Sequence, residues 1–236
     1  MKSYRTNRGP FATRPFYKTS TIEAICTDEL LAVQLFPKSP EPIRIERFIG
    51  KRFGITPDYE DLPEGTLGYS LFGPGGVERI VIASILGEDP SKQADRRVRT
   101  TLAHEAGHVL LQGHLFVLGE QAQSLFDDSL NMDHPRILCR DLPGISSTGP
   151  RRYDGRWWEF QANSAIGPLL LPRPLVQKAI EPLLETRGLL ETKILPAIKR
   201  TLATESLAEI FDVNPVVARI RLGEVFPASD ESQLTL

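Results

Sequence analysis

Three of the chain's four histidines lie close together in the sequence, at His104, His108 and His114. The first two form an HExxH motif in which Glu105 follows His104. In a helix, four residues advance the chain by about 400° and about 6 Å, so the two imidazoles point the same way. Such a pair is suited to one zinc ion, and the adjacent carboxylate can take a proton from a zinc-bound water. The motif therefore predicts a hydrolytic zinc site with His104 and His108 as ligands and Glu105 as the base.

The residues around this motif favour a buried site over a solvated helix face. The motif follows the apolar stretch TLA and precedes the stretch VLL. Polar side chains inside an apolar helix are costly unless they are satisfied. Gly107 costs a helix interior about 1 kcal/mol, and its missing side chain allows another backbone to come close. We therefore expect the histidine helix to pack against a second element.

The sequence offers two candidates for a third ligand. His114 has the outer spacing of the metzincin pattern HExxHxxGxxH, but Leu111 stands where that pattern has a helix-breaking glycine. If the helix continues, His114 lies about 9 Å along the axis from His108 and about 120° around it, too far to share an ion. Glu159, in the segment WWEFQAN, lies on a separate amphipathic segment and can complete a His2Glu site with an open fourth position. We expect Glu159 to be the ligand, with His114 as the alternative.

The segment that carries Glu159 contains two further features that suit a metal site. Asn163 stands one helical turn beyond Glu159 and can accept a hydrogen bond from the far nitrogen of a liganding histidine, which fixes its tautomer. Three small residues on the same segment favour close packing against the histidine helix: Ala162, Ala165 and Gly167.

The stretch TLAHEAGHVLL, followed by EFQANSAIGPLLLP, resembles the ImmA/IrrE family of zinc metallopeptidases. The resemblance covers roughly residues 40–225 and implies that His104, His108 and Glu159 bind Zn2+ and that Glu105 is the base. It also implies an α+β fold, mainly helical, with a small β-sheet beside the HExxH helix, of the gluzincin-like type. Members commonly cleave or antagonise helix-turn-helix repressors encoded beside them, which implies a protein substrate of that kind.

Apolar spacing predicts the surrounding elements. Helices are expected at 20–36, 40–54, 93–116, 155–171, 173–188 and 190–203, with a helix-turn-helix-like pair at 205–226 and two strands within 65–73 and 76–87. Residues 1–20 contain five basic residues and no acidic residue, which predicts a disordered basic tail. The predicted organisation is this tail, a metallopeptidase domain at 21–188, a C-terminal helical appendage at 189–226 and a disordered tail at 227–236.

The long segment 117–154 has no clear periodicity, and such segments are often lids or cleft walls. It is longer than in minimal members of the family that the chain resembles. A peptidase also needs a group that stabilises the oxyanion. His134 and Tyr153 are the candidates in this segment for oxyanion or substrate contacts.

Composition and charge limit the other function classes. The net charge of −2 gives no reason to expect binding to nucleic acid or to an anionic membrane. Residues 189–226 contain five basic and five acidic residues, so we expect no direct DNA contact from the helical pair. No secretory signal or membrane span is expected, and the two cysteines, Cys26 and Cys139, are expected to be reduced in a cytoplasmic protein.

Two hypotheses follow from these patterns. The first is a cytoplasmic zinc endopeptidase that hydrolyses a peptide bond in a protein substrate such as a repressor. The alternative is a non-cleaving regulatory protein that binds a repressor or DNA and has a structural or vestigial zinc. Three protein ligands with an open position favour the enzyme, whereas a fourth protein ligand favours the binding protein.

Overall fold

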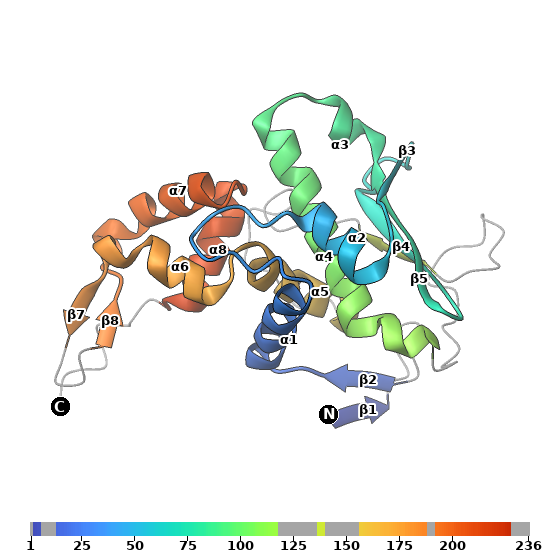
Figure 1. Cartoon of the computed structure of the whole chain (residues 1–236), viewed down its shortest axis with the longest axis horizontal. Helices are drawn as coiled ribbons and strands as arrows, with labels where there is room; N and C mark the ends of the chain where they lie inside the picture. Colours follow the sequence, from blue (N-terminus) through green and yellow to red (C-terminus); the bar gives the residue numbers. More distant parts are fainter. Residues whose placement is uncertain (1, 6–12, 118–135, 140–155, 188–191, 228–236) are drawn as a thin grey trace.

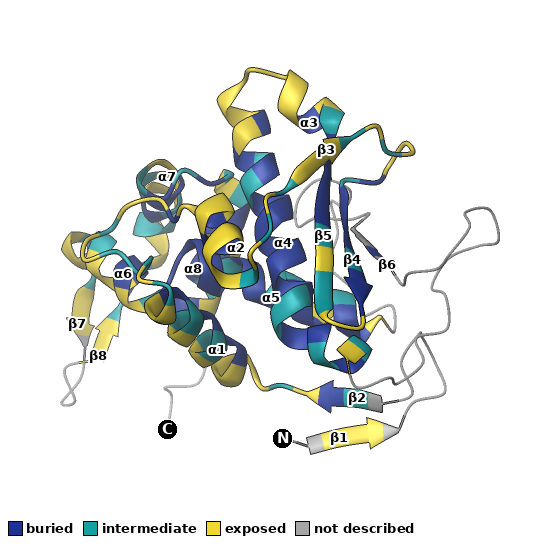
Figure 2. Cartoon of the chain, turned by 45° about the vertical axis from the view of Figure 1, so that its right-hand side comes forward, coloured by how far each residue is buried: buried dark blue, intermediate teal, exposed yellow. Residues whose placement is uncertain are grey.

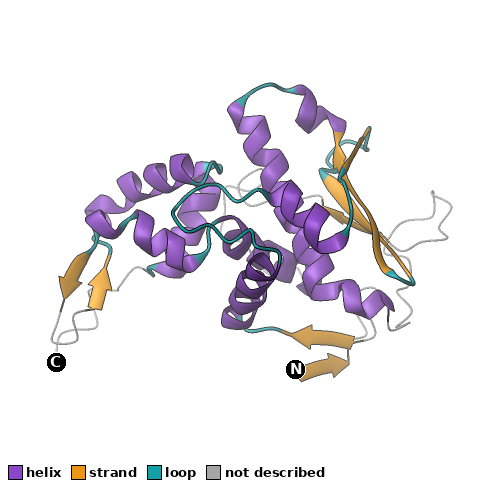
Figure 3. Ribbon diagram, viewed as in Figure 1, coloured by secondary structure: helices purple, strands orange, loops and turns teal. Residues whose placement is uncertain are grey.

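Helix α4, Lys92–Val117, runs between a small β-sheet and most of the other helices (Figure 1). The computed structural model describes residues 2–5, 13–117, 136–139, 156–187 and 192–227. The main sheet lies on one side of α4 and most of the other helices on the opposite side, while two short strand pairs lie at the bottom and at the far left (Figure 3). This arrangement confirms the expected α+β class, mainly helical with small sheets.

The main sheet has the strand order β3-β5-β4-β6. Strands β4 and β5 lie in the two segments predicted as strands and pair antiparallel, with β3 parallel to β5 and β6 antiparallel to β4. Their bounds are Asp58–Glu60 for β3, Gly68–Gly73 for β4, Gly76–Ala83 for β5 and Arg136–Cys139 for β6. The second segment, predicted at 76–87, is a strand only to Ala83, where a short helix, Ser84–Glu88, follows. Gly76, at the end of the tight β4–β5 turn, has a φ of 114°, a conformation that glycine adopts without steric cost.

Strand β4 lies lengthwise on helix α4. Alternate residues of a strand share a face, so Gly68 and Ser70 face the same way. A Cβ added to Gly68 would lie 3.0 Å from Cγ2 of Thr101 on α4, so only glycine allows the strand to come this close. Ser70 then meets Glu105, which lies one helical turn beyond Thr101. The glycine therefore sets the distance between the sheet and the HExxH motif.

The helices around α4 share one hydrophobic core. Helix α2 ends at Gly54, whose φ of 72° is the left-handed conformation common at helix ends. Leu102 of α4 and Leu207 of α7 belong to the same buried cluster, so the predicted C-terminal appendage shares the core of the remaining chain. The bounds are Thr19–Ala32 for α1, Ile45–Phe53 for α2, Ser84–Glu88 for α3, Trp157–Leu170 for α5, Arg173–Ala179 for α6, Arg200–Ile210 for α7 and Pro215–Val225 for α8.

Two predicted helices in the region 173–203 are wrong in extent. Helix α6 stops at Ala179 and is followed by a 3-10 turn, Glu181–Leu183, and by the antiparallel strands β7, Glu185–Arg187, and β8, Thr192–Ile194. Pro182 and Pro196 interrupt the helical pattern because proline lacks the backbone N–H that an interior helical position donates. A second 3-10 turn follows Pro196, and α7 begins only at Arg200.

The prediction of a disordered tail at 1–20 is also wrong for the residues that the structure describes. Strands β1, Lys2–Arg5, and β2, Thr13–Phe16, form an antiparallel pair, and α1 begins at Thr19. The hydroxyl of Tyr17 donates a hydrogen bond to the carbonyl of Leu111, 3.3 Å away on α4. Contacts with residues that are distant in the sequence thus join this pair to the rest of the molecule. Apolar periodicity does not predict such contacts. Residues 228–236 of the predicted C-terminal tail lie outside the described residues.

The middle of α4 is enclosed, since residues 100–108 are all buried, and Figure 2 shows it among buried segments of β4, β5 and α5. The described helices include none that is both long and apolar enough to cross a bilayer.

Candidate metal centre

His104, His108 and Glu159 come together between α4 and α5. The Nε2 atoms of the two histidines lie 2.9 Å apart. The Glu159 carboxylate spans both rings, with Oε2 at 3.3 Å from Nε2 of His104 and Oε1 at 3.4 Å from Nε2 of His108. One ligand atom from each residue lies within 4.8 Å of the other two. The arrangement can hold a metal ion.

Gly107 allows the two helices to approach closely enough to form this group. A Cβ at this position would lie 3.0 Å from the carbonyl oxygen of Ala162 and 3.0 Å from the Cβ of Ala165. Gly107, which directly precedes His108, therefore packs against the backbone of Ala162 and the Cβ of Ala165 on α5. The predicted close helix packing is confirmed at these residues.

Burial and mutual charge set the protonation of the three groups. Burial and the His108 charge lower the pKa of His104. Burial lowers the pKa of His108, but the Glu159 carboxylate outweighs it and the net shift is upward. Burial alone would raise the pKa of Glu159, but the two imidazoles lower it by more than burial raises it. The carboxylate is therefore ionised at neutral pH. An anionic carboxylate facing two imidazole nitrogens is a donor set that suits a divalent cation such as Zn2+.

Glu105 is fully buried beside the histidines and accepts a hydrogen bond from Ser70. The Ser70 hydroxyl donates to Oε2 at 2.6 Å, and Oε1 has no hydrogen-bond partner among the described residues. Burial raises the pKa of Glu105 to about 8, although the His108 charge and the Ser70 hydroxyl act in the opposite direction. A cation bound nearby favours the ionised form of the carboxylate. One oxygen is thus fixed, and the other is available to accept a proton.

The second ring nitrogens of the two histidines have different surroundings. Nδ1 of His108 lies 3.0 Å from Oε1 of Gln112. Asn163 lies close to His104, as predicted, and acts to raise its pKa, although burial makes the net shift downward. However, Nδ1 of His104 and Oδ1 of Asn163 are both buried without a hydrogen-bond partner among the described residues, so the predicted bond is not formed.

The other sequence candidates fall outside this group. Helix α4 continues through Leu111 to Val117, so His114 stays on the helix and is not part of the His104, His108 and Glu159 group. His134 and Tyr153, the oxyanion candidates, lie outside the described residues, as does most of the predicted lid. The Cys26 thiol is free and buried.

Three polar residues near the site were missed by the sequence reasoning. They are Ser70, which contacts Glu105, Gln112, which contacts His108, and Gln161, which contacts Gln112. Gln112 could have been found, because it stands four residues after His108 and so shares its helix face. Nothing in the local sequence pattern places Ser70 against α4.

Comparisons of the sequence with protein-family models and with curated proteins give no match.

Proposed function

We propose that the chain is a zinc-dependent endopeptidase of the ImmA/IrrE type, with a gluzincin-like fold. It hydrolyses a peptide bond in a protein substrate, such as a helix-turn-helix repressor in the cytoplasm. The observation that carries the proposal is the convergence of His104, His108 and Glu159 beside a buried carboxylate, Glu105, on the same helix face.

The proposed roles follow from the positions of the side chains. His104, His108 and Glu159 would hold the ion, which supplies Lewis acidity and lowers the pKa of water towards about 7. Glu105 accepts the proton of the attacking water at Oε1, because Ser70 already occupies Oε2. The same carboxyl group then delivers that proton to the leaving amine.

The enclosure of the site supports a reaction from which bulk water is excluded. His104, Glu105 and His108 are fully buried, whereas the Glu159 side chain keeps 14% of its surface exposed. Low-dielectric surroundings strengthen the interaction of a buried carboxylate with developing charge. We infer that a substrate approaches from the side of Glu159.

The number of ligands favours the enzyme over a regulatory protein with structural zinc. Structural zinc sites usually have four protein ligands, whereas catalytic sites have three and an open position. In the part of the chain that the structure describes, the group consists of three such residues.

The proposal is tested by comparing the wild type with Glu105→Gln. Both should contain about one zinc per chain by elemental analysis, because Glu105 is not a ligand. Cleavage of a helix-turn-helix repressor that the wild type cleaves should fall by about 100-fold or more, the usual effect of removing a general base. Equal cleavage rates would refute the role of Glu105. Bound zinc without cleavage by the wild type would instead support the regulatory protein.

A further inference from the structure

A chain of hydrogen bonds connects the metal centre to the N-terminal hairpin. Gln112 Oε1 lies 3.0 Å from Nδ1 of His108, and Gln112 Nε2 donates to Gln161 Oε1 at 2.8 Å. Gln161 Nε2 in turn donates to the backbone carbonyl of Pro15, on strand β2, at 2.8 Å. The two glutamines are at most 4% exposed, so water does not compete for these bonds.

The carbonyl of Pro15 determines the direction of every bond in this chain. A carbonyl only accepts, so Gln161 must turn its NH2 group towards Pro15 and its oxygen towards Gln112. Gln112 must then donate through its own NH2 group, which leaves its oxygen facing His108. An oxygen at that position accepts only from a protonated Nδ1. The neutral form of His108 therefore carries its proton on Nδ1 and keeps its Nε2 lone pair free, and Nε2 is the atom that faces His104 and Glu159.

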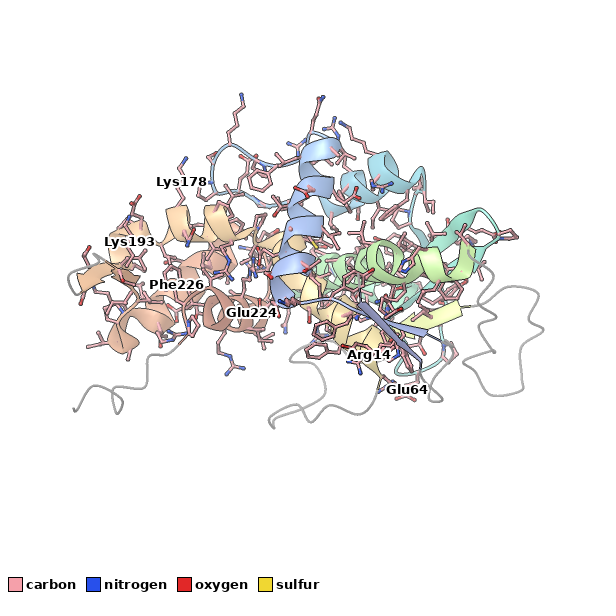
Figure 4. All side chains as sticks on the ribbon, turned by 90° about the horizontal axis from the view of Figure 1, so that it is seen from below. Arg14, Glu64, Lys178, Lys193, Glu224 and Phe226 are labelled. Atoms are coloured by element: carbon pink, nitrogen blue, oxygen red, sulfur yellow. The ribbon has the colours of Figure 1, made fainter. Side chains whose placement is uncertain are left out.

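The position of Pro15 in its strand suits this role. Proline has no N–H to give to a neighbouring strand, so this residue can face away from β1 at no cost in hydrogen bonds. Pro15 is buried, and the Tyr17 contact with Leu111 anchors the chain two residues later. Figure 4, in which Arg14 is labelled, shows this hairpin beside α5 and on a different part of the molecule from Lys178 and Lys193.

We propose that Gln112 and Gln161 are positioning residues that transmit the polarity of the Pro15 carbonyl to His108 and hold its metal-binding tautomer. The inference rests on the metal-binding part of the proposed function. It makes the N-terminal hairpin a part of the metal centre, although none of the hairpin residues that the structure describes belongs to the ligand group. Groups that bond the far nitrogen of a liganding histidine typically change metal affinity by about 10–100-fold.

The first test measures zinc affinity by competition with a chelator. Gln112→Met should weaken zinc binding by about 10-fold or more, and Gln161→Met by a smaller factor, because the Gln112 amide can then rotate. Gln93→Met, at an exposed position of the same helix, should leave the affinity unchanged. The double variant Gln112→Met/Gln161→Met should be no weaker than Gln112→Met alone, since the two residues act in series. Unchanged affinity in Gln112→Met, or additive losses in the double variant, would overturn the inference.

The second test reads the tautomer without metal. Imidazole ¹⁵N NMR of the metal-free wild type, at a pH where His108 is neutral, should show its proton on Nδ1, and Gln112→Met should lose this preference. A proton on Nε2 in the wild type would overturn the proposed positioning role of Gln112 and Gln161 even if zinc binds. Failure of the wild type to bind zinc would instead refute the proposed function. The NMR result would still decide whether the two glutamines set the tautomer of His108.

Discussion

Helix α5 has a buried charged cluster near each end, and the two clusters are built in opposite ways. At its C-terminal end, the Arg221 guanidinium, 1% exposed, donates to the carbonyl of Leu171 at 2.9 Å and to Glu224 at 3.1 Å, and it also contacts Glu23. Near its N-terminal end, Glu159 and two imidazoles direct acceptor atoms at one another.

The difference separates a cluster that supports the fold from a cluster that can bind an ion. In the Arg221 cluster, the cation is part of the protein and faces two carboxylates, although Oε2 of Glu23 has no hydrogen-bond partner among the described residues. In the metal centre, the acceptors converge with no cationic side chain of Lys or Arg among them in the described residues. Burying such groups is costly without a partner. We therefore expect the first cluster to contribute stability at all times and the second to depend on an added proton or metal ion.

The largest effect on stability is expected at the Arg221 cluster. Arg221→Leu leaves Glu23 without its buried partner, and breaking a buried pair in this way costs about 3 kcal/mol or more. The free energy of unfolding, measured by urea denaturation, should fall by that amount, while the zinc affinity of the folded protein stays within about twofold of wild type. Arg219→Leu, at an exposed position of the same helix, is the control and should change neither quantity. If Arg221→Leu lost zinc binding while remaining folded, the two clusters would not be independent.

The second prediction concerns the pH dependence of the metal-free protein. The pKa of Glu105 is raised to about 8, so the folded state keeps a proton that the unfolded state releases near pH 4.5. The contribution of Glu105 to stability should therefore fall as pH rises from about 4.5 to about 8, by at most about 1.4 kcal/mol per pH unit. Glu105→Gln cannot ionise, so its stability relative to the wild type should increase across this window.

Denaturation of both proteins in the presence of a chelator, at pH 5.5 and 7.5, measures this difference. Subtracting the two curves cancels the titration of the shared groups other than His108, whose pKa Glu105 also raises. A stability difference that does not change with pH would contradict the account of Glu105.

A smaller effect is expected from the helix contact that forms the metal centre. A Cβ at Gly107 would lie 3.0 Å from the carbonyl oxygen of Ala162, whereas a Cβ at Gly113 would lie at an ordinary 3.7 Å from the Phe72 ring. Both substitutions by alanine gain up to about 1 kcal/mol in helix propensity. Gly107→Ala should nevertheless lose about 1–2 kcal/mol of stability from overpacking and weaken zinc binding, because α5 must move away from α4.

Gly113→Ala is the matched control and should be neutral or stabilising, with unchanged zinc affinity. Thermal unfolding and zinc titration of the two variants measure the contrast. Equal behaviour of the two would show that close packing at Gly107 does not hold Glu159 in place.

The comparison also explains which parts of the molecule the sequence could predict. His104, Glu105 and His108 lie within one helix, so their relative placement follows from helical geometry alone. Glu159 could be inferred because its own helix carries small residues suited to packing against Gly107. Helices α4 and α5 match the expected 93–116 and 155–171 closely, whereas α1 ends at Ala32 instead of residue 36 and α2 begins at Ile45 instead of residue 40.

The features that were missed depend on contacts between distant segments. Ser70 reaches Glu105 only because β4 lies on α4 at Gly68, which no local pattern specifies. The strands β1 and β2 are short, and their pairing and burial come from α4 and α5 rather than from periodicity. In the region 173–203 the apolar spacing suggested helices, but its prolines outweigh that pattern.

The central claim is that His104, His108 and Glu159 form one cation site, and zinc titration of Glu159→Ala tests it most directly. The wild type and His114→Ala should each bind one zinc per chain with the same affinity, whereas Glu159→Ala should bind at least about 100-fold more weakly while remaining folded. Full zinc binding by Glu159→Ala, or its loss in His114→Ala, would contradict the account.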